Sequence, residues 1–209
     1  MSKWAANTSS WVEPEIGNEA AICIRIIDLG TQMKEYQGKQ SWKRQSMIVW
    51  ELPGQLDGDG KPLTISKFYT ASLGDKANLR HDLENWRGRP FTPEELKGFE
   101  QKNILGKPCL LNLIQNDKGK VVVGSVSAIP KGFNAPSQAV HECFIYSLDE
   151  HDEAIWNKLS DGIKGLIMKS KEKSPQLHAA APSNKGNAPT YEGSEPVDLP
   201  PDEDDIIPF

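Results

Sequence analysis

Hydrophobic and polar positions alternate with a period of two in the first part of the chain, which is the spacing of a half-buried strand. In residues 20–28 (AAICIRIID), Ile22, Ile24 and Ile26 share one face. Residues 41–52 (SWKRQSMIVWEL) and 62–70 (PLTISKFYT) are rich in β-branched and aromatic residues, and the turn GQLDGDGKP separates them. The pattern predicts three consecutive strands.

The apolar spacing then changes to that of a helix. Leu79, Leu83 and Trp86 follow one another at intervals of four and three residues, so they fall on one helical face. Asp75 is placed to cap the start and Gly88 to end the helix. The sequence therefore predicts an amphipathic helix after the third strand.

A further short helix and two more strands complete the central part of the chain. Thr92 and Pro93 are the cap and first residue expected of a helical turn. Residues 108–116 and 120–129 are strand-like and are joined by the tight turn DKGK. A short extended piece, ECFIYSL, follows after a loop.

The segment DEHDEAIWNKLSDGIKGLIMKSKE predicts one more helix, from Asp152 to about Glu172. Its acidic start and basic end agree with the helix dipole. Ile155, Leu159 and Ile163 form part of an apolar stripe, although two glycines weaken the middle. This helix could serve as a lid, as a packing brace or as an oligomer contact.

Five strands with a helix between the third and fourth is the element order of the OB-fold, a partly open barrel that binds oligonucleotides on one face. We therefore expect a mainly β protein with helices: an OB-fold domain over residues 1–150 and an appended C-terminal helix over 151–174. After Lys173 the composition turns to Pro, Ala, Ser, Asn and Gly, which predicts a disordered tail over 175–209.

Charge is distributed unevenly between body and tail. The tail holds seven acidic residues against Lys185 alone, a net charge of −6, which leaves +1 for residues 1–174 of a chain whose total is −5. Such asymmetry is typical of proteins that interact with nucleic acid or regulate themselves through a tail. A body charge of +1 also requires the cations of any DNA-binding surface to be clustered.

Aromatic and basic residues are interleaved on the second and third predicted strands. Proteins that bind single strands use this mixture, because bases stack on aromatic rings while cations follow the phosphates. If Met47 and Val49 face inward, then Trp42, Arg44 and Trp50 face outward, with Ile48 beside them. The alternative is that some of these aromatic rings fill the barrel. The predicted DNA-contacting residues here are Arg25, Trp42, Lys43, Arg44, Trp50, Lys67, Phe68 and Tyr69.

A second basic cluster, WRGRPF, adds Arg87 and Arg89 to the candidate DNA-binding residues. These arginines could hold the backbone of a strand as it leaves the groove. In the favoured alternative, Trp86 and Phe91 fasten the helix to the barrel while both arginines remain solvated.

Signatures of enzymes and metal sites are absent or incomplete in the sequence. Gly106 and Lys107 are followed by Pro108 rather than by Ser or Thr, so they do not form a phosphate-binding loop. His141 and Cys143 could join another cysteine around zinc, but without a CxxC pair we expect reduced, buried cysteines instead. We expect neither an enzyme nor a cofactor or metal.

The cellular setting follows from the cysteines and from the first residues. The three cysteines are odd in number and far apart, and MSKWAANTSSW contains no apolar run typical of a signal peptide. No stretch is long enough to span a membrane. We therefore expect a cytosolic protein without membrane attachment.

The final stretch, PPDEDDIIPF, combines acids with an apolar end. The acids could occupy a cationic groove in place of DNA phosphates. A partner with an apolar pocket beside a basic rim could bind the terminal side chain together with its α-carboxylate. The predicted partner-binding residues are Asp202, Glu203, Asp204, Asp205, Ile206, Ile207, Pro208 and Phe209.

This ending resembles the acidic tip of bacterial single-stranded DNA-binding proteins, whose terminus recruits replication and repair enzymes. The body is different. From LRHDLENWRGRPFTPEEL through NILGKPCLLNLIQNDKGK to IPKG, about residues 20–131, it is similar to the replication-protein-A-like single-stranded DNA-binding proteins of tailed bacteriophages. The resemblance implies an OB-fold that coats single-stranded DNA during phage replication and recombination, in the cytoplasm of a bacterial host.

The expected function is therefore non-sequence-specific binding and protection of single-stranded DNA, with a role in replication, recombination and repair. The tail would recruit replication and recombination proteins and compete with DNA. A different class of function remains open: an OB-like adaptor whose barrel binds protein and whose tail docks on the host replication machinery.

Overall fold

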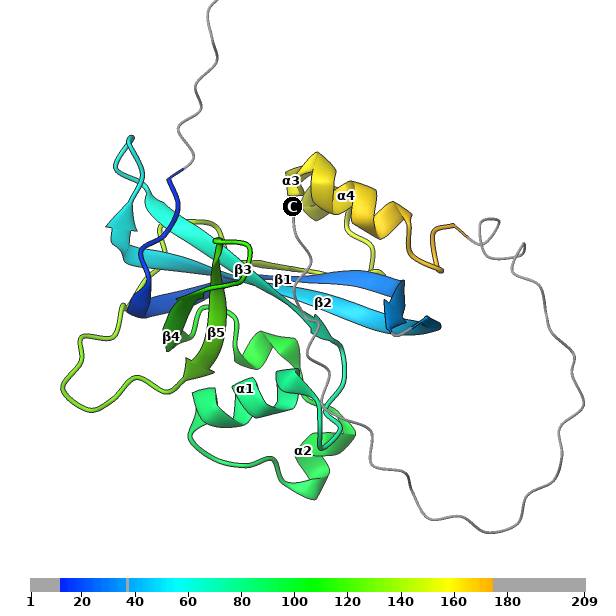
Figure 1. The fold of residues 1–209 in the computed structure, drawn as a ribbon, viewed down its shortest axis with the longest axis horizontal. Helices are drawn as coiled ribbons and strands as arrows, with labels where there is room; N and C mark the ends of the chain where they lie inside the picture. Colours follow the sequence, from blue (N-terminus) through cyan, green and yellow to red (C-terminus); the bar gives the residue numbers. More distant parts are fainter. Residues whose placement is uncertain (1–11, 37, 175–209) are drawn as a thin grey trace, which may run out of the picture.

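The computed structural model describes residues 12–36 and 38–174 of the chain. The predicted tail, with its partner-binding residues 202–209, lies outside the described residues. Within them the protein is mainly β, with six strands and four α-helices around one sheet (Figure 1). None of these helices is long and apolar enough to cross a membrane.

The sheet has the order β3-β2-β1-β4-β5, and neighbours along this path are antiparallel. The short strand β6 lies parallel to β1, beyond the point at which β4 leaves it. All five strands expected from the sequence are present. The strands are β1 (Gly17–Tyr36), β2 (Lys39–Leu56), β3 (Pro62–Thr70), β4 (Pro108–Gln115), β5 (Val121–Ser127) and β6 (Phe144–Tyr146).

The first two strands are longer than the sequence pattern indicates. Beyond Gly30 they pair only with each other, and the ladder continues through Met33 opposite Trp42 to the end of the hairpin. The side chains there are mostly polar on both faces, so the apolar alternation stops although the strands do not. We call residues 31–36 and 39–44 the hairpin arm.

The helices α1 (Asn78–Arg87), α2 (Pro93–Lys97) and the 3-10 helix η1 (Gln101–Asn103) lie between β3 and β4 in sequence. Gly88 ends α1 in the left-handed conformation as predicted, and Thr92 caps α2 with a full capping box. The N-cap of α1 is Ala77 and not Asp75, which was expected there. Asp75 instead pairs with Arg80.

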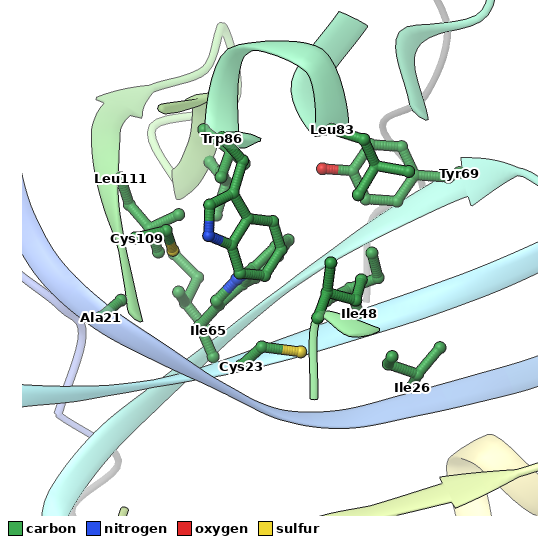
Figure 2. Close-up of a cluster of buried hydrophobic side chains, with 14 of the residues drawn as sticks. Ala21, Cys23, Ile26, Ile48, Ile65, Tyr69, Leu83, Trp86, Cys109 and Leu111 are labelled. Atoms are coloured by element: carbon green, nitrogen blue, oxygen red, sulfur yellow. The ribbon is translucent and has the colours of Figure 1, made fainter. Parts of the chain in front are cut away.

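One face of the sheet packs against α1 (Figure 1). Trp50 from β2 and Trp86 from α1 meet in this core with ring centroids 6.3 Å apart. Figure 2 shows Trp86 in this core together with Cys109 and Leu111 of β4. Trp86 Nε1 also donates a hydrogen bond of 2.8 Å to the carbonyl of Pro108. The predicted fastening of the helix to the sheet through Trp86 and Phe91, which is buried in the same core, is confirmed.

The opposite face is covered by the C-terminal part of the described chain, residues 139–174, which we call the brace. It contains β6 and two short helices, α3 (Glu153–Lys158) and α4 (Asp161–Met168). The single helix expected over 152–172 is wrong. Leu159 is extended, with ψ 143°, and Ser160 begins a new helix by accepting a hydrogen bond from the N–H of Ile163.

Packing under the brace is extensive. Twelve apolar residues are buried there, among them Ile27 and Met47 from the sheet and Leu159 and Ile163 from the brace. Burying one such side chain is worth about 1.5–3 kcal/mol, so peeling the brace away would expose a large apolar surface. Three roles were considered for this region: a lid, a packing brace and an oligomer contact. The extensive packing supports the role of a packing brace.

The two edges of the sheet approach each other without joining. No backbone ladder connects β3 to β5 in the described residues, so closure of a barrel is not detected. A side chain spans the space between the two edges instead. Lys67 Nζ on β3 donates a hydrogen bond of 3.2 Å to the carbonyl of Gly124 on β5.

Candidate nucleic-acid interface

A groove of about 450 Å³ lies between the sheet and the brace. Its apolar floor comes from β1 and β2, with Ile27, Met47 and Val49. One wall is β3, and the other is the turn between α3 and α4, where Lys158 and Ser160 lie. The brace thus covers most of this face of the sheet and leaves an opening along β3.

Among the predicted DNA-contacting residues, all of which the structure describes, Arg25 alone lines this groove. It lies on β1 opposite Phe144 of β6, and its guanidinium carbon is 5.3 Å from the centroid of the Phe144 ring. Its Nε atom is buried and has no hydrogen-bond partner. An unpaired buried donor is rare in folded proteins, so the chain itself satisfies this guanidinium poorly.

The second cation of the groove, Lys158, comes from the end of α3. Its Nζ lies 2.5 Å from Glu142 Oε1, and both side chains are largely solvated. An exposed pair of this kind contributes little to stability, so a phosphate could replace the carboxylate at small cost. The groove therefore offers one cation from the sheet and one from the brace beside an apolar floor.

Lys67 and Arg44, two further cations predicted to bind DNA, are held by acidic residues of the same chain. Lys67 is nearly buried, and its Nζ lies 2.9 Å from Asp82 Oδ2. Arg44 binds Asp28 at 2.5 Å and Asp149 at 2.6 Å, and the hydrogen bond to Asp28 is the main reason that the pKa of Arg44 is raised. These ion pairs fix the sheet edge and the brace, which leaves the two cations less available to phosphates.

Arg87 and Arg89 share one acidic partner, Glu95 of α2. Their hydrogen bonds, led by that of Arg89, together with the N–H of Thr92 lower the pKa of Glu95 to about 2. Arg87 also lies over the Phe91 ring, 4.3 Å from its centroid. Arg89 is 54% exposed in its side chain, so the expectation of solvation holds for Arg89 and not for Arg87, at 14%.

Three of the four strand aromatics predicted to contact DNA are buried, so the alternative that some of these rings fill the core applies to them. Trp50 is 0% exposed and Tyr69 1% in the core under α1, and Phe68 is 6% exposed under the brace. Met47 and Val49 lie on the brace side, while Ile48 lies with Trp50 under α1, so the assumed faces are exchanged. No ring of the three is exposed for stacking in this structure.

Trp42 is the predicted aromatic that remains accessible, with 37% of its surface exposed. It lies on the hairpin arm directly opposite Met33, which is 51% exposed. Lys43 follows it on the same strand and is half-buried. Trp42 and Met33 together form a small exposed apolar surface beside basic residues.

Three residues of the candidate interface were not predicted from the sequence. Phe144 and Lys158 reach the groove from the brace, which was not expected to contribute to the interface. Phe133 is 59% exposed in the loop between β5 and β6, two residues after Lys131. The motif IPKGF carries the same aromatic and basic mixture as the strands and could have indicated this loop.

The brace is attached to the sheet by a buried carboxylate beside the groove. Glu51 is fully buried and accepts hydrogen bonds from the backbone N–H groups of Val140 and His141, and its Oε2 lies 2.7 Å from His141 Nδ1. Burial alone would raise the pKa of Glu51, but these hydrogen bonds outweigh it and lower the pKa. An ionised Glu51 therefore holds the start of the brace.

Metal and thiol chemistry are not supported within the described residues. No group of three or more His, Cys, Asp or Glu residues there could hold a metal ion. Cys23 and Cys109 are buried as expected, and burial raises the pKa of both thiols. Cys143, in contrast, is exposed.

Comparisons with known proteins add no family to this description. No protein-family model matches the chain, and no curated protein matches its sequence. The likeness to phage single-stranded DNA-binding proteins therefore remains an expectation from the sequence.

Proposed function

We propose that this protein binds single-stranded DNA without sequence specificity and coats it during phage replication, recombination and repair in a bacterial host. The proposal includes an OB-fold for the sheet and α1. The strand order supports it, because a meander of three strands, a helix and two further strands, with β1 beside β4, is the OB-fold sequence of elements.

The observation that carries the proposal is Arg25 in the groove. Its buried Nε lacks an acceptor, and the apolar floor beside it can receive a base while the guanidinium binds a phosphate. Trp42 and Met33 on the hairpin arm add a surface on which a further base can stack. Neither the groove nor the surface on the hairpin arm would distinguish one base sequence of the DNA from another.

The tail completes the proposal from sequence alone. Its acids would compete with DNA for Arg25 and neighbouring cations, and its apolar end would recruit replication and recombination proteins. The brace, together with the sheet, forms the DNA-binding unit, since Phe144 and Lys158 belong to the brace and line the groove.

The proposal is tested by tryptophan fluorescence during titration with poly-dT, at low and high salt. The full chain is compared with a chain ending at Ser174, the last residue described. We expect quenching that weakens with salt, and tighter binding by the shorter chain. An absence of quenching in both would contradict DNA binding.

A second function, an adaptor that binds protein through its body, is favoured by one observation. Lys67, Arg44 and Arg87 are tied to acidic residues of the chain itself, which leaves fewer cations than a coat protein needs. An adaptor would fail to bind poly-dT and would lose its partner when the last four residues are removed.

A further inference from the structure

We infer that the groove beside Arg25 is a pocket for one nucleotide, with the phosphate at Arg25 and Lys158 and the base on the floor of Ile27, Met47 and Val49. The protein would then bind free nucleoside monophosphates. This inference rests on the proposed function and specifies how part of a DNA strand is held.

The size of the groove limits what it can hold. Sites on single OB-folds cover about 4–16 nucleotides, whereas pockets of about 300–1,000 Å³ hold one small molecule. The groove measures about 450 Å³, in the lower part of that second range. It can therefore enclose one nucleotide, and the rest of a bound strand must lie outside it.

The charges around the groove favour a phosphate. Arg25 makes no ion pair among the described residues, and its Nε has no acceptor. Lys158, in the wall formed by the brace, is paired with the solvated Glu142, which can turn away into water. One cation from the sheet and one from the brace match the charge of a nucleoside monophosphate.

The remainder of the groove favours a base over a bare anion. Its floor consists of the buried side chains of Met47, Val49 and Ile27, which offer no donor to an anion. The Phe144 ring supports the Arg25 guanidinium from one side, and a planar guanidinium can stack on a base as well as bind phosphate. Ser66 and Ser160 supply hydroxyl groups at the walls for the edge of the base.

Calorimetric titration of the full chain tests the inference, with thymidine monophosphate, thymidine and inorganic phosphate as separate ligands. We expect the monophosphate to bind at least about tenfold more tightly than either fragment, because each fragment loses one half of the site. Inorganic phosphate binding as well as the monophosphate would overturn the nucleotide pocket in favour of a simple anion site.

Two variants locate the binding site. Arg25→Gln should weaken monophosphate binding about tenfold or more, and Lys158→Gln should weaken it several-fold. Lys61→Gln removes one positive charge from an exposed turn away from the groove and should leave the affinity within about twofold. Because Lys158 is solvated, its variant keeps the test valid even if Arg25→Gln lowers the thermal transition.

Titration with poly-dT separates this inference from the proposed function. If poly-dT binds and thymidine monophosphate does not, the one-nucleotide pocket is wrong while single-strand binding stands. If neither binds, both fail. If both bind and Arg25→Gln weakens the two together, the pocket is part of the DNA-binding surface.

Discussion

Lys67 Nζ on β3 lies 2.9 Å from Asp82 Oδ2 on α1, and the hydroxyl group of Tyr69 donates to the same oxygen at 2.8 Å. Lys67 also reaches the carbonyl of Gly124 on β5. This ion pair therefore links three elements at the position where the two edges of the sheet meet without a backbone ladder.

Replacing Asp82 with Ala should destabilise the protein strongly. The change removes the carboxylate that the Lys67 ammonium group and the Tyr69 hydroxyl group share in a nearly buried site, and breaking a buried pair costs about 3–5 kcal/mol. Urea denaturation measures the free energy of unfolding. Glu100→Ala breaks the exposed pair with Lys102 and should cost no more than about 1 kcal/mol. Equal losses in the two variants would show that the buried pair has no special role.

Replacement by Ala should mainly affect stability at Trp50 and mainly affect DNA binding at Trp42. Trp50 is enclosed by the core, so Trp50→Ala should lower the free energy of unfolding by about 3–5 kcal/mol. Trp42→Ala should cost clearly less, because 37% of the Trp42 surface is already exposed. If the arm binds DNA, Trp42→Ala should weaken poly-dT binding by about 1–3 kcal/mol, as expected for the loss of one stacked base. Denaturation and fluorescence titration measure the two effects.

Burial on both faces of β2 explains why Trp50 was predicted to face outward. Alternation reveals the inner face of a strand only where the other face is wet. On β2 the run from Gln45 to Leu52 is buried throughout, because α1 covers one face and the brace covers the other. The apolar run from Met47 to Trp50 predicted the strand correctly but carried no information about its orientation.

Ion pairing limited the prediction of the binding residues in the same way. Lys67 and Asp82 are fifteen residues apart in sequence, and Arg44 and Asp149 are separated by 105 residues, so no local pattern joins them. Most local signals were reliable: β3 has the predicted bounds, and Gly88 and Thr92 act where turn and cap chemistry placed them. The exceptions are the cap of α1, which is Ala77, and the break between α3 and α4 at Leu159. The sequence predicts local geometry well, and tertiary packing decides which cations remain available.

The stability of the protein should fall as the pH decreases from about 4.5 toward about 2, in part through Glu95. Its pKa is about 2 in the folded protein, against an ordinary value of 4.5. Between these values the unfolded chain takes up a proton that the folded protein refuses, so acid favours unfolding. The stabilisation is complete above about pH 4.5 and is lost as the pH falls through the folded pKa.

Urea midpoints measured across this pH range check the role of Glu95. Glu95→Gln should flatten the acid part of the curve, because a neutral amide cannot titrate. Glu94→Gln is the matched control, since Glu94 is an exposed neighbour on the same helix without an ion pair among the described residues. A control curve flattened to the same degree would assign the effect to the general charge of α2.

Gly30 should tolerate no side chain, because its position fixes the brace against β1. Its φ is +73°, and an added Cβ would lie 2.7 Å from Leu148 Cδ1 and from Ser170 Cβ, both in the brace. Gly30→Ala should therefore cost about 1–2 kcal/mol for the left-handed backbone and about 1–3 kcal/mol more for the crowded contact. Gly38→Ala, at φ +74° with open space around it, should be destabilised only by the backbone conformation. Thermal denaturation of the two variants isolates the contact, and equal shifts would mean that the brace yields freely at this point.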